Sequence, residues 1–222
     1  SCFCRPGFLL NPDLATCSDV DECEQWGVCS QLCTNLPGGH SCSCLPGYTS
    51  ANGSCLAAQG STLLLFSTKT AVRGLNLTSS LYFPVARDLP HVIGVGFDSP
   101  SQRVYWTDVM AGRETIHSSL LDGGDRRQLV TSGLDMPEDL VVDETNRNLY
   151  FTDSIAKRIG VCSLDSSRGC AVLATDVEQP RAIALHVARQ LVLFTDWGTN
   201  SKSIGQLGMD GKGRRSLVTK EL

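Results

Sequence analysis

The sequence predicts an all-β protein in two parts, a disulfide-rich head followed by a β-propeller that is only partly present. The head is predicted because nine of the eleven cysteines lie within the first 55 of 222 residues. The propeller is predicted because a four-residue motif recurs at a period in the low forties, amid short strand-like stretches that Gly, Pro, Asn and Asp separate. No segment keeps the apolar periodicity of a helix over about ten residues.

The cysteine-rich head is the first element of the chain. So many cysteines in so short a stretch indicate disulfides formed in an oxidising compartment. Zinc binding is less favoured, because the spacings lack paired Cys-x-x-Cys clips and His40 has no second histidine nearby. Spacing alone leaves several disulfide pairings open. Small modules bury little apolar surface, so bridges that each stabilise by about 2–4 kcal/mol are expected to decide whether the head folds.

The run DVDECEQWGVCSQLCTNLPGGHSCSCLPGYTSANGSC at residues 19–55 resembles a calcium-binding EGF-like module. The resemblance implies three disulfides within it: Cys23–Cys33, Cys29–Cys42 and Cys44–Cys55. The upstream run CFCRPGFLLNPDLATC at 2–17 resembles the tail of a preceding EGF-like module, which implies a Cys4–Cys17 disulfide. Cys2 is then unpaired, with its partner expected before residue 1, and this accounts for the odd number of cysteines.

The acidic start of the EGF-like module carries a separate calcium signal. The resembled family's Asp-x-Asp-Glu pattern implies a Ca²⁺ site with these ligands: the side chains of Asp19, Glu22 and Asn35, and the carbonyls of Val20, Leu36 and Gly39. We expect a structural ion that stiffens the module and binds at about 10⁻⁴–10⁻³ M. An acidic linker that binds nothing is the alternative. His40 stands where the family usually has an aromatic residue, which weakens the packing expected against a neighbouring module.

The repeated motif occupies the rest of the chain. Its copies are YWTD at 105–108, YFTD at 150–153 and LFTD at 193–196, and a degenerate copy precedes them at 63–77. The aromatic residues Trp106, Phe151 and Phe194 therefore stand 45 and 43 residues apart. Aromatic side chains that each bury about 150–250 Å² suit wedges between radial sheets. Thr suits a strand, and Asp accepts backbone N–H groups where a strand ends. The motif therefore indicates a construction element of the propeller.

The alternative is that the motif aspartates Asp108, Asp153 and Asp196 form a ring that binds a central metal, as in hydrolytic propellers. Copies at every blade favour a scaffold, because catalysis normally breaks such symmetry. No Ser or Cys nucleophile with a paired His stands out. The sequence therefore predicts that the protein is not an enzyme.

Cys162 and Cys170 flank a hairpin within the second full repeat, which carries YFTD. Counting inward from the turn places them opposite each other, where a cross-strand pair has the separation of a disulfide. Two independent buried thiols are the alternative. Asn52 and Asn76 begin Asn-x-Ser/Thr sequences and are predicted glycosylation sites in a secreted chain.

The repeats resemble the YWTD repeat, also called LDL receptor class B, whose copies close six four-stranded blades into a propeller. The LFTDWG variant at 193–198 strengthens this resemblance. Six blades need about 260 residues, whereas residues 58–222 hold one degenerate and three full repeats. We therefore expect a partial six-bladed propeller at 58–222, after an EGF-like tail at 1–17 and a calcium-binding EGF-like module at 18–57, in a fragment of a longer chain.

Composition and charge limit the classes of function and partner that the sequence predicts. The net charge is −4 and no basic stripe exists, so nucleic acid is not an expected partner. The longest aliphatic run, TLLLF at 62–66, is far shorter than the about 20 residues of a spanning helix. The opening SCFCRPG lacks the pattern of a signal peptide, so targeting and anchoring segments are expected outside this sequence.

The order of modules resembles the LDL receptor family. That resemblance implies the extracellular part of a single-pass endocytic receptor, with lipoprotein or yolk-protein cargo held by modules outside this sequence and a receptor chaperone as a further partner. In acidic endosomes the propeller would compete for the acidic ligand-binding modules of the same chain and release the cargo. His91, His117 and His186 are the candidate pH sensors, because imidazole gains charge between about pH 7 and 5; ordinary surface histidines are the alternative.

A second function is a signalling co-receptor or matrix adhesion protein that binds a protein ligand on the propeller face. For the endocytic function, the propeller face complementary to the acidic modules would be formed by arginines in two of the repeats: Arg113, Arg126, Arg127, Arg214 and Arg215. A solvated turn surface is the alternative.

Overall fold

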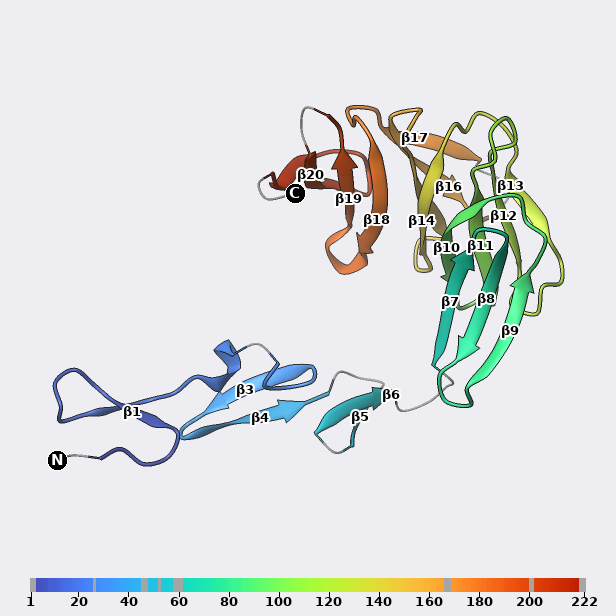
Figure 1. Ribbon diagram of the computed structural model, residues 1–222. Helices are drawn as coiled ribbons and strands as arrows, with labels where there is room; N and C mark the ends of the chain where they lie inside the picture. The colour runs from blue at the N-terminus through green and yellow to red at the C-terminus, as the bar shows by residue number, and fades with distance from the viewer. Residues whose placement is uncertain are drawn as a thin grey trace. The chain divides into compact units, whose positions relative to one another are not determined.

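The computed structural model describes residues 3–25, 27–44, 48–51, 53–57, 62–165, 169–199 and 202–219 (Figure 1). The chain divides into two compact units, Ser1–Thr62 and Leu63–Leu222. Both consist of strands with short 3₁₀ turns, so the predicted all-β fold is confirmed. Among the described residues, no helix has the length and apolar character needed to cross a membrane. Within these units, the module limits 1–17, 18–57 and 58–222 stay predictions.

The first unit consists of three hairpins and one 3₁₀ turn. Its elements are β1 (Phe8–Leu10) paired with β2 (Cys17–Asp19), η1 (Glu22–Glu24), β3 (Leu32–Leu36) paired with β4 (Gly39–Ser43), and β5 (Tyr48–Ala51) paired with β6 (Ser54–Ala57). None of its described side chains is fully buried. An apolar core therefore contributes little to its stability.

Disulfides take the place of that core. The described residues of the first unit form four: Cys4–Cys17, Cys23–Cys33, Cys29–Cys42 and Cys44–Cys55. These are the pairs that the EGF resemblance implied. Each cross-link restricts the unfolded chain and stabilises the folded one by about 2–4 kcal/mol. Cys2 lies outside the described residues.

The second unit contains four sheets, which we call blades 1 to 4 (Figure 1). Blade 1 has the strands β7 (Leu63–Thr68), β8 (Ala71–Asn76) and β9 (Leu81–Ala86). Blade 2 has β10 (Val92–Asp98), β11 (Arg103–Asp108), β12 (Thr115–Leu120) and β13 (Arg127–Val130). Blade 3 has β14 (Pro137–Asp143), β15 (Asn148–Asp153), β16 (Arg158–Ser163) and β17 (Cys170–Ala174). Blade 4 has β18 (Pro180–His186), η2 (Val187–Arg189), β19 (Leu191–Trp197), β20 (Lys202–Gly208) and β21 (Arg215–Val218).

Neighbouring blades contact each other through their first strands, β10 with β14 and β14 with β18. The motif lies in the second strand of each four-stranded blade, β11, β15 and β19. Strand β7 holds the degenerate copy and contacts β10 as β11 contacts β14. The described strands of blade 1 therefore match the second, third and fourth strands of the other blades. The four blades form an open part of a propeller.

The two ends of the blades differ. In each four-stranded blade, the first residue of the first strand pairs with the motif aspartate. We call this the motif end, marked by Asp108, Asp153 and Asp196. The first strands finish at the opposite end, which we call the turn end, marked by Asp98, Asp143 and His186.

The aromatic residues of the motif are wedges between blades, as predicted. Trp106 is fully buried in a cluster with blade 1, Tyr105 shares a cluster with Phe151 of blade 3, and Tyr150 shares one with Phe194 of blade 4. Consecutive residues of a strand point to opposite faces of the sheet. One aromatic of each pair therefore packs toward the preceding blade and its neighbour toward the next.

In blades 3 and 4 the third strand has a glycine opposite the second wedge residue, which leaves room for the aromatic ring. Phe151 lies opposite Gly160, where a Cβ atom would be 2.2 Å from the Phe151 Cζ atom. Phe194 lies opposite Gly205, where the same distance would be 2.5 Å. In blade 2 this position is His117, whose ring stacks on Trp106 with 5.6 Å between centroids.

Blade 3 also carries a covalent link. Cys162 on β16 is directly opposite Cys170 on β17, and the two form a disulfide with 4.0 Å between Cα atoms. Cys162 is buried and Cys170 is exposed. The bridge therefore ties the outermost strand of blade 3 to its neighbour.

Candidate calcium site and propeller sites

The candidate calcium ligands of the first unit come together from two hairpins. Asp19 is the last residue of β2, and its carboxylate accepts hydrogen bonds from the Asn35 side-chain amide at 2.9 Å and from the Gly38 backbone N–H at 2.5 Å. Asn35 lies on β3 and Gly38 in the turn that follows. The fold thus brings together the two side chains that the sequence singled out on either side of η1.

Glu22 opens η1 and faces the same hairpin. Its Oε2 atom lies 3.6 Å from Nδ1 of His40, which is the cross-strand partner of Asn35. This oxygen is buried and accepts no hydrogen bond from the described residues. A buried carboxylate oxygen without a donor is costly unless a cation balances it. Together with Asp19, Glu22 presents the hard oxygen atoms that Ca²⁺ prefers.

The preceding hairpin packs directly against this site. The Val20 N–H donates to the Gly7 carbonyl at 2.9 Å, and Gly38 contacts the ring of Phe8. A Cβ atom at Gly7 would lie 2.4 Å from the Gly38 carbonyl oxygen, and both glycines have φ near +85° (84° and 85°). Only glycine meets both demands without strain. The hairpins therefore meet at the candidate ligands.

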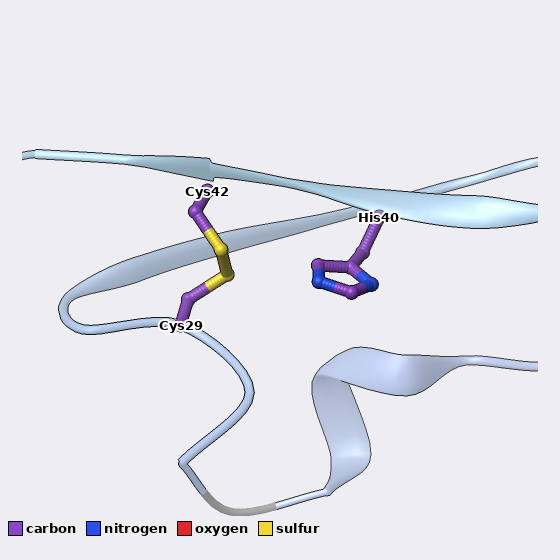
Figure 2. A group of neighbouring side chains, drawn as sticks. All are labelled: Cys29, His40 and Cys42. Atoms are coloured by element: carbon purple, nitrogen blue, oxygen red, sulfur yellow. A yellow bond between two sulfur atoms is a disulfide. The ribbon is translucent and has the colours of Figure 1, made fainter. Parts of the chain in front are cut away.

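Figure 2 shows a second group of metal-type side chains in this unit, Cys29, His40 and Cys42, whose ligand atoms lie within 4.8 Å of one another. The two cysteines form a disulfide and carry no thiolate. Since zinc binds thiolates, this group is not a zinc centre. In the part of the chain that the structure describes, no other three His, Cys, Asp or Glu residues lie as close.

The motif aspartates cap backbone groups of their own blades. Asp153 accepts hydrogen bonds from the Asp135 and Met136 N–H groups at 3.2 and 2.8 Å. Asp196 likewise accepts from Glu178 N–H at 3.0 Å and Gln179 N–H at 2.7 Å. Each carboxylate thus fastens the loop before the first strand to the end of the motif strand. This arrangement supports the construction role rather than a metal ring.

A buried ion pair joins blades 2 and 3 at the turn end. The fully buried Asp98 accepts from Arg147 Nη1 at 2.6 Å and from the Ser101 hydroxyl. Burial by itself raises the pKa of Asp98, but hydrogen bonds from Arg147 and Ser101 outweigh it and hold that pKa below its usual value. This pair was not predicted from the sequence. The signal is that Arg147 replaces the glutamines Gln102 and Gln190 of the other repeats.

We predict that this pair makes the propeller acid-sensitive. The folded pKa of Asp98 is lowered, so its stabilisation is present above the unfolded value of 3.8 and is lost as pH falls through the folded value. Arg147→Gln, which restores the residue of the other repeats, should lower the free energy of unfolding by about 1–3 kcal/mol at pH 7. In this variant the free energy of unfolding should also fall less steeply as pH decreases below about 4. Urea unfolding from pH 7 to 2 measures both effects. Parallel pH profiles for the two proteins would contradict the prediction.

The three candidate pH sensors do not share a face. His186 is exposed at the turn end of blade 4. His91 directly precedes β10 at the motif end, and His117 lies near that end on β12. Burial, and then the nearby Arg126 charge, lower the pKa of His117, while Asp108 opposes this shift.

Comparisons with known proteins agree with these modules. The family model described as "Calcium-binding EGF domain" matches residues 19–59, and "Low-density lipoprotein receptor repeat class B" matches residues 102–144. The chain is 40% identical over 230 residues to the vitellogenin receptor Yl of Drosophila melanogaster, covering 98% of this chain and 11% of that protein. It is 34% identical over 230 residues to the vitellogenin receptor of Solenopsis invicta, covering 100% of this chain and 12% of that protein. The chain belongs to the LDL receptor family.

Other relatives of this LDL receptor family chain support the same assignment. The low-density lipoprotein receptor-related protein 5 of Mus musculus is 33% identical over 202 residues, covering 87% of this chain and 12% of that protein. The chain spans about a tenth of these relatives (11% or 12%). A solved nidogen/laminin complex has a chain that is 28% identical, with a TM-score of 0.66 over 73% of this chain and 63% of that chain. A putative TolB from Agrobacterium tumefaciens, 17% identical with a TM-score of 0.60 over 70% of this chain and 61% of that chain, shows the fold alone.

These comparisons bear on two predictions, Ca²⁺ binding and the absence of enzymatic activity. The EGF match supports Ca²⁺ binding by the first unit. The matched models are receptor modules and the curated relatives are receptors, so this LDL receptor family chain is not an enzyme.

Proposed function

We propose that the chain is part of the extracellular region of an endocytic receptor for vitellogenin-type lipoproteins. The observation that carries the proposal is the match to two vitellogenin receptors over 98% and 100% of this chain. In this proposal the cargo binds to modules outside these residues, and the protein cycles between the cell surface and endosomes. The chain itself supplies a stiffened first unit, Ser1–Thr62, which we call the stem, and a propeller scaffold.

The stem role depends on Ca²⁺. Asp19, Glu22 and Asn35 would hold the ion by their side chains, and Val20, Leu36 and Gly39 by their carbonyls, as the family pattern implies. Bound Ca²⁺ would supply the positive charge that the buried Glu22 oxygen lacks. Because the β1–β2 hairpin packs at the same place, the ion would restrain the two hairpins relative to each other.

We predict that Glu22→Gln weakens Ca²⁺ binding by at least about tenfold, since it removes a charged oxygen ligand. Isothermal titration of the whole chain with CaCl₂ measures this change. Asp21→Asn is the matched control, because the Asp21 carboxylate caps the Cys23 N–H at 2.9 Å within the same acidic run. Equal losses in both variants would show that only the net charge of the run matters.

In the proposed cycle the propeller releases cargo by binding the acidic ligand-binding modules of the same receptor at low pH. Imidazole groups gain charge as endosomes acidify, which favours such a contact. His186 is the best placed of the three candidates, because it is exposed at a turn. His91 and His117 lie toward the opposite end of their blade and would serve a different contact surface.

Binding between the propeller of the intact receptor and its acidic modules at pH 5 and pH 7 tests the proposal. We expect tighter binding at pH 5, with the difference reduced in His186→Ala. Unchanged pH dependence after His91, His117 and His186 are all replaced by Ala would remove the sensor role. Equal binding at both pH values would contradict release by competition.

A second function, ligand binding on the propeller face, is favoured by exposed apolar side chains at the motif end. Met110, Ile155 and Trp197 follow the motif in three successive blades and are 43, 61 and 46% exposed. Ile155→Ser with Trp197→Ser in the full receptor separates the two functions. Normal vitellogenin capture at neutral pH supports the endocytic scaffold, whereas lost capture supports a ligand on this face.

We also propose an N-linked glycan on Asn76. This residue ends β8 at the turn end of blade 1, where its Oδ1 accepts from the Thr78 and Ser79 N–H groups at 2.9 and 3.0 Å. The adjacent Leu77 and Thr78 are exposed, so the turn offers room for a sugar. A mass shift on peptide-N-glycosidase treatment that Asn76→Gln abolishes would support the site. Asn52 lies outside the described residues.

A further inference from the structure

A hollow beside Trp106 sets blade 2 apart from its neighbours. It lies near the motif end, and seven of the residues that line it are polar or charged: Asp108, Arg113, Thr115, His117, Arg126, Gln128 and Thr131. His117 is the cross-strand partner of both Trp106 and Gln128, so the three side chains share one face of the sheet. That face packs against blade 1, because Trp106 belongs to the cluster of blade 1 residues.

The two arginines of this hollow are unpaired. Arg113 and Arg126 are exposed, and neither makes an ion pair within the described part of the chain. Arg126 instead lies over the Trp106 ring, 5.3 Å from its centroid. The one acidic group, Asp108, is buried and accepts a hydrogen bond from the Met110 N–H at 3.1 Å.

The arginines that lie beside the motif aspartates of blades 3 and 4 are neutralised. Arg214 takes the place of Arg126 in blade 4 and pairs with Asp176 at 2.6 Å and Asp196 at 3.6 Å. Blade 3 has Cys170 at the place of Arg126, and its Arg158, which stands at the place of Thr115, pairs with the motif aspartate Asp153 at 2.9 Å. Blade 2 therefore differs from both in leaving two guanidinium groups available at one hollow.

We propose that this hollow binds an oxyanion, the carboxylate or sulfate group of a ligand, between the guanidinium groups of Arg113 and Arg126. Guanidinium groups present several N–H donors in a plane and bind such groups through charge-assisted hydrogen bonds. The Gln128 amide adds a neutral donor at the same wall. This inference concerns blade 2 alone and does not depend on cargo release by the receptor.

His117 couples the hollow to pH. The groups that face its ring are Trp106, Thr115, Arg126 and Asp108, with Thr115 Oγ1 2.7 Å from Nε2. An anion bound beside the ring favours the charged imidazolium. By linkage, the affinity for the anion rises as pH falls and His117 takes up a proton.

The experiment follows the Trp106 indole N–H by NMR while sodium sulfate or sodium acetate is added to the whole chain at constant ionic strength. The chain has three tryptophans, so Trp197→Phe narrows the assignment. We expect a saturable shift, and at least about fivefold weaker binding in Arg113→Ala. Arg189→Ala, which removes an exposed arginine of blade 4, should leave the affinity unchanged. Tighter binding of acetate identifies a carboxylate ligand, and tighter binding of sulfate a sulfated one.

The proposal is overturned if neither salt gives a saturable shift, or if Arg113→Ala and Arg126→Lys both bind as the unchanged chain does. Arg113 is exposed and makes no ion pair, so its variant tests binding without disturbing the packing on Trp106. His117→Gly restores the glycine of blades 3 and 4 and should keep binding at pH 7 while losing the gain at lower pH. A gain that persists in His117→Gly would refute the coupling to this residue.

Discussion

Replacing Trp106 by Ala should destabilise the propeller unit by about 3–5 kcal/mol, the usual cost of removing a large buried aromatic side chain. Trp106 is fully buried, packs in a cluster with blade 1 and stacks on His117 of its own blade. Its loss would leave a cavity at the seam between two blades, and rigid sheets on both sides could not collapse to fill it.

Urea unfolding followed by far-ultraviolet circular dichroism measures the loss for the whole chain. Trp197→Ala is the matched control, because it removes the same side chain from a position that is 46% exposed in blade 4. We expect that control to cost less than about 1 kcal/mol. Similar losses in the two variants would contradict the view that the second motif residue acts as a wedge between blades.

Asp153→Ala should lower the free energy of unfolding by about 3–5 kcal/mol, as much as Trp106→Ala. The reason is that it breaks a buried ion pair and leaves Arg158 without its countercharge. Asp153 is fully buried, and its carboxylate accepts from Arg158 at 2.9 Å and from three backbone N–H groups. All four donors lose their acceptor in the variant. The loop that leads into β14 would also lose its attachment to the motif strand.

The control for this prediction is Asp176→Ala. Asp176 pairs with Arg214 at 2.6 Å, but its side chain is largely exposed. Surface pairs of this kind contribute about 0–1 kcal/mol, so thermal or urea unfolding should show a small change. If Asp153→Ala were as mild as Asp176→Ala, the motif aspartate would not be the structural cap that its hydrogen bonds indicate.

Much of the fold was predictable because its signals are local or periodic. The 45- and 43-residue steps between the aromatic residues predict a propeller without any knowledge of tertiary contacts. The alternation of strand residues places Tyr105 and Trp106 on opposite faces whatever the blade arrangement. The disulfide pairs are a different case, because spacing left them open and only the family resemblance implied them.

The candidate sites were less predictable, because they depend on residues that meet across turns and seams. The sequence identified Asp19, Glu22 and Asn35 through a family pattern. It did not show that a buried Glu22 oxygen faces His40, nor that Gly7 and Gly38 let the neighbouring hairpin pack at the same point. Those facts depend on backbone contacts between segments that are distant in sequence.

By itself, the sequence determined the all-β class, the disulfide-rich first unit and the presence of an aromatic residue before the Thr-Asp of each full repeat. These features follow from cysteine density, strand alternation and repeat period, which are all local or periodic along the chain. Only the tertiary structure decided how equivalent positions differ between blades. Arg126 and Arg214 occupy the same place in their repeats and each lies over an aromatic ring, yet only Arg214 also pairs with aspartates, whereas Arg126 lines an open hollow. Ion pairs form between side chains that neighbouring strands and blades bring into contact. Those contacts exist only in the packed fold, so the sequence alone does not predict them.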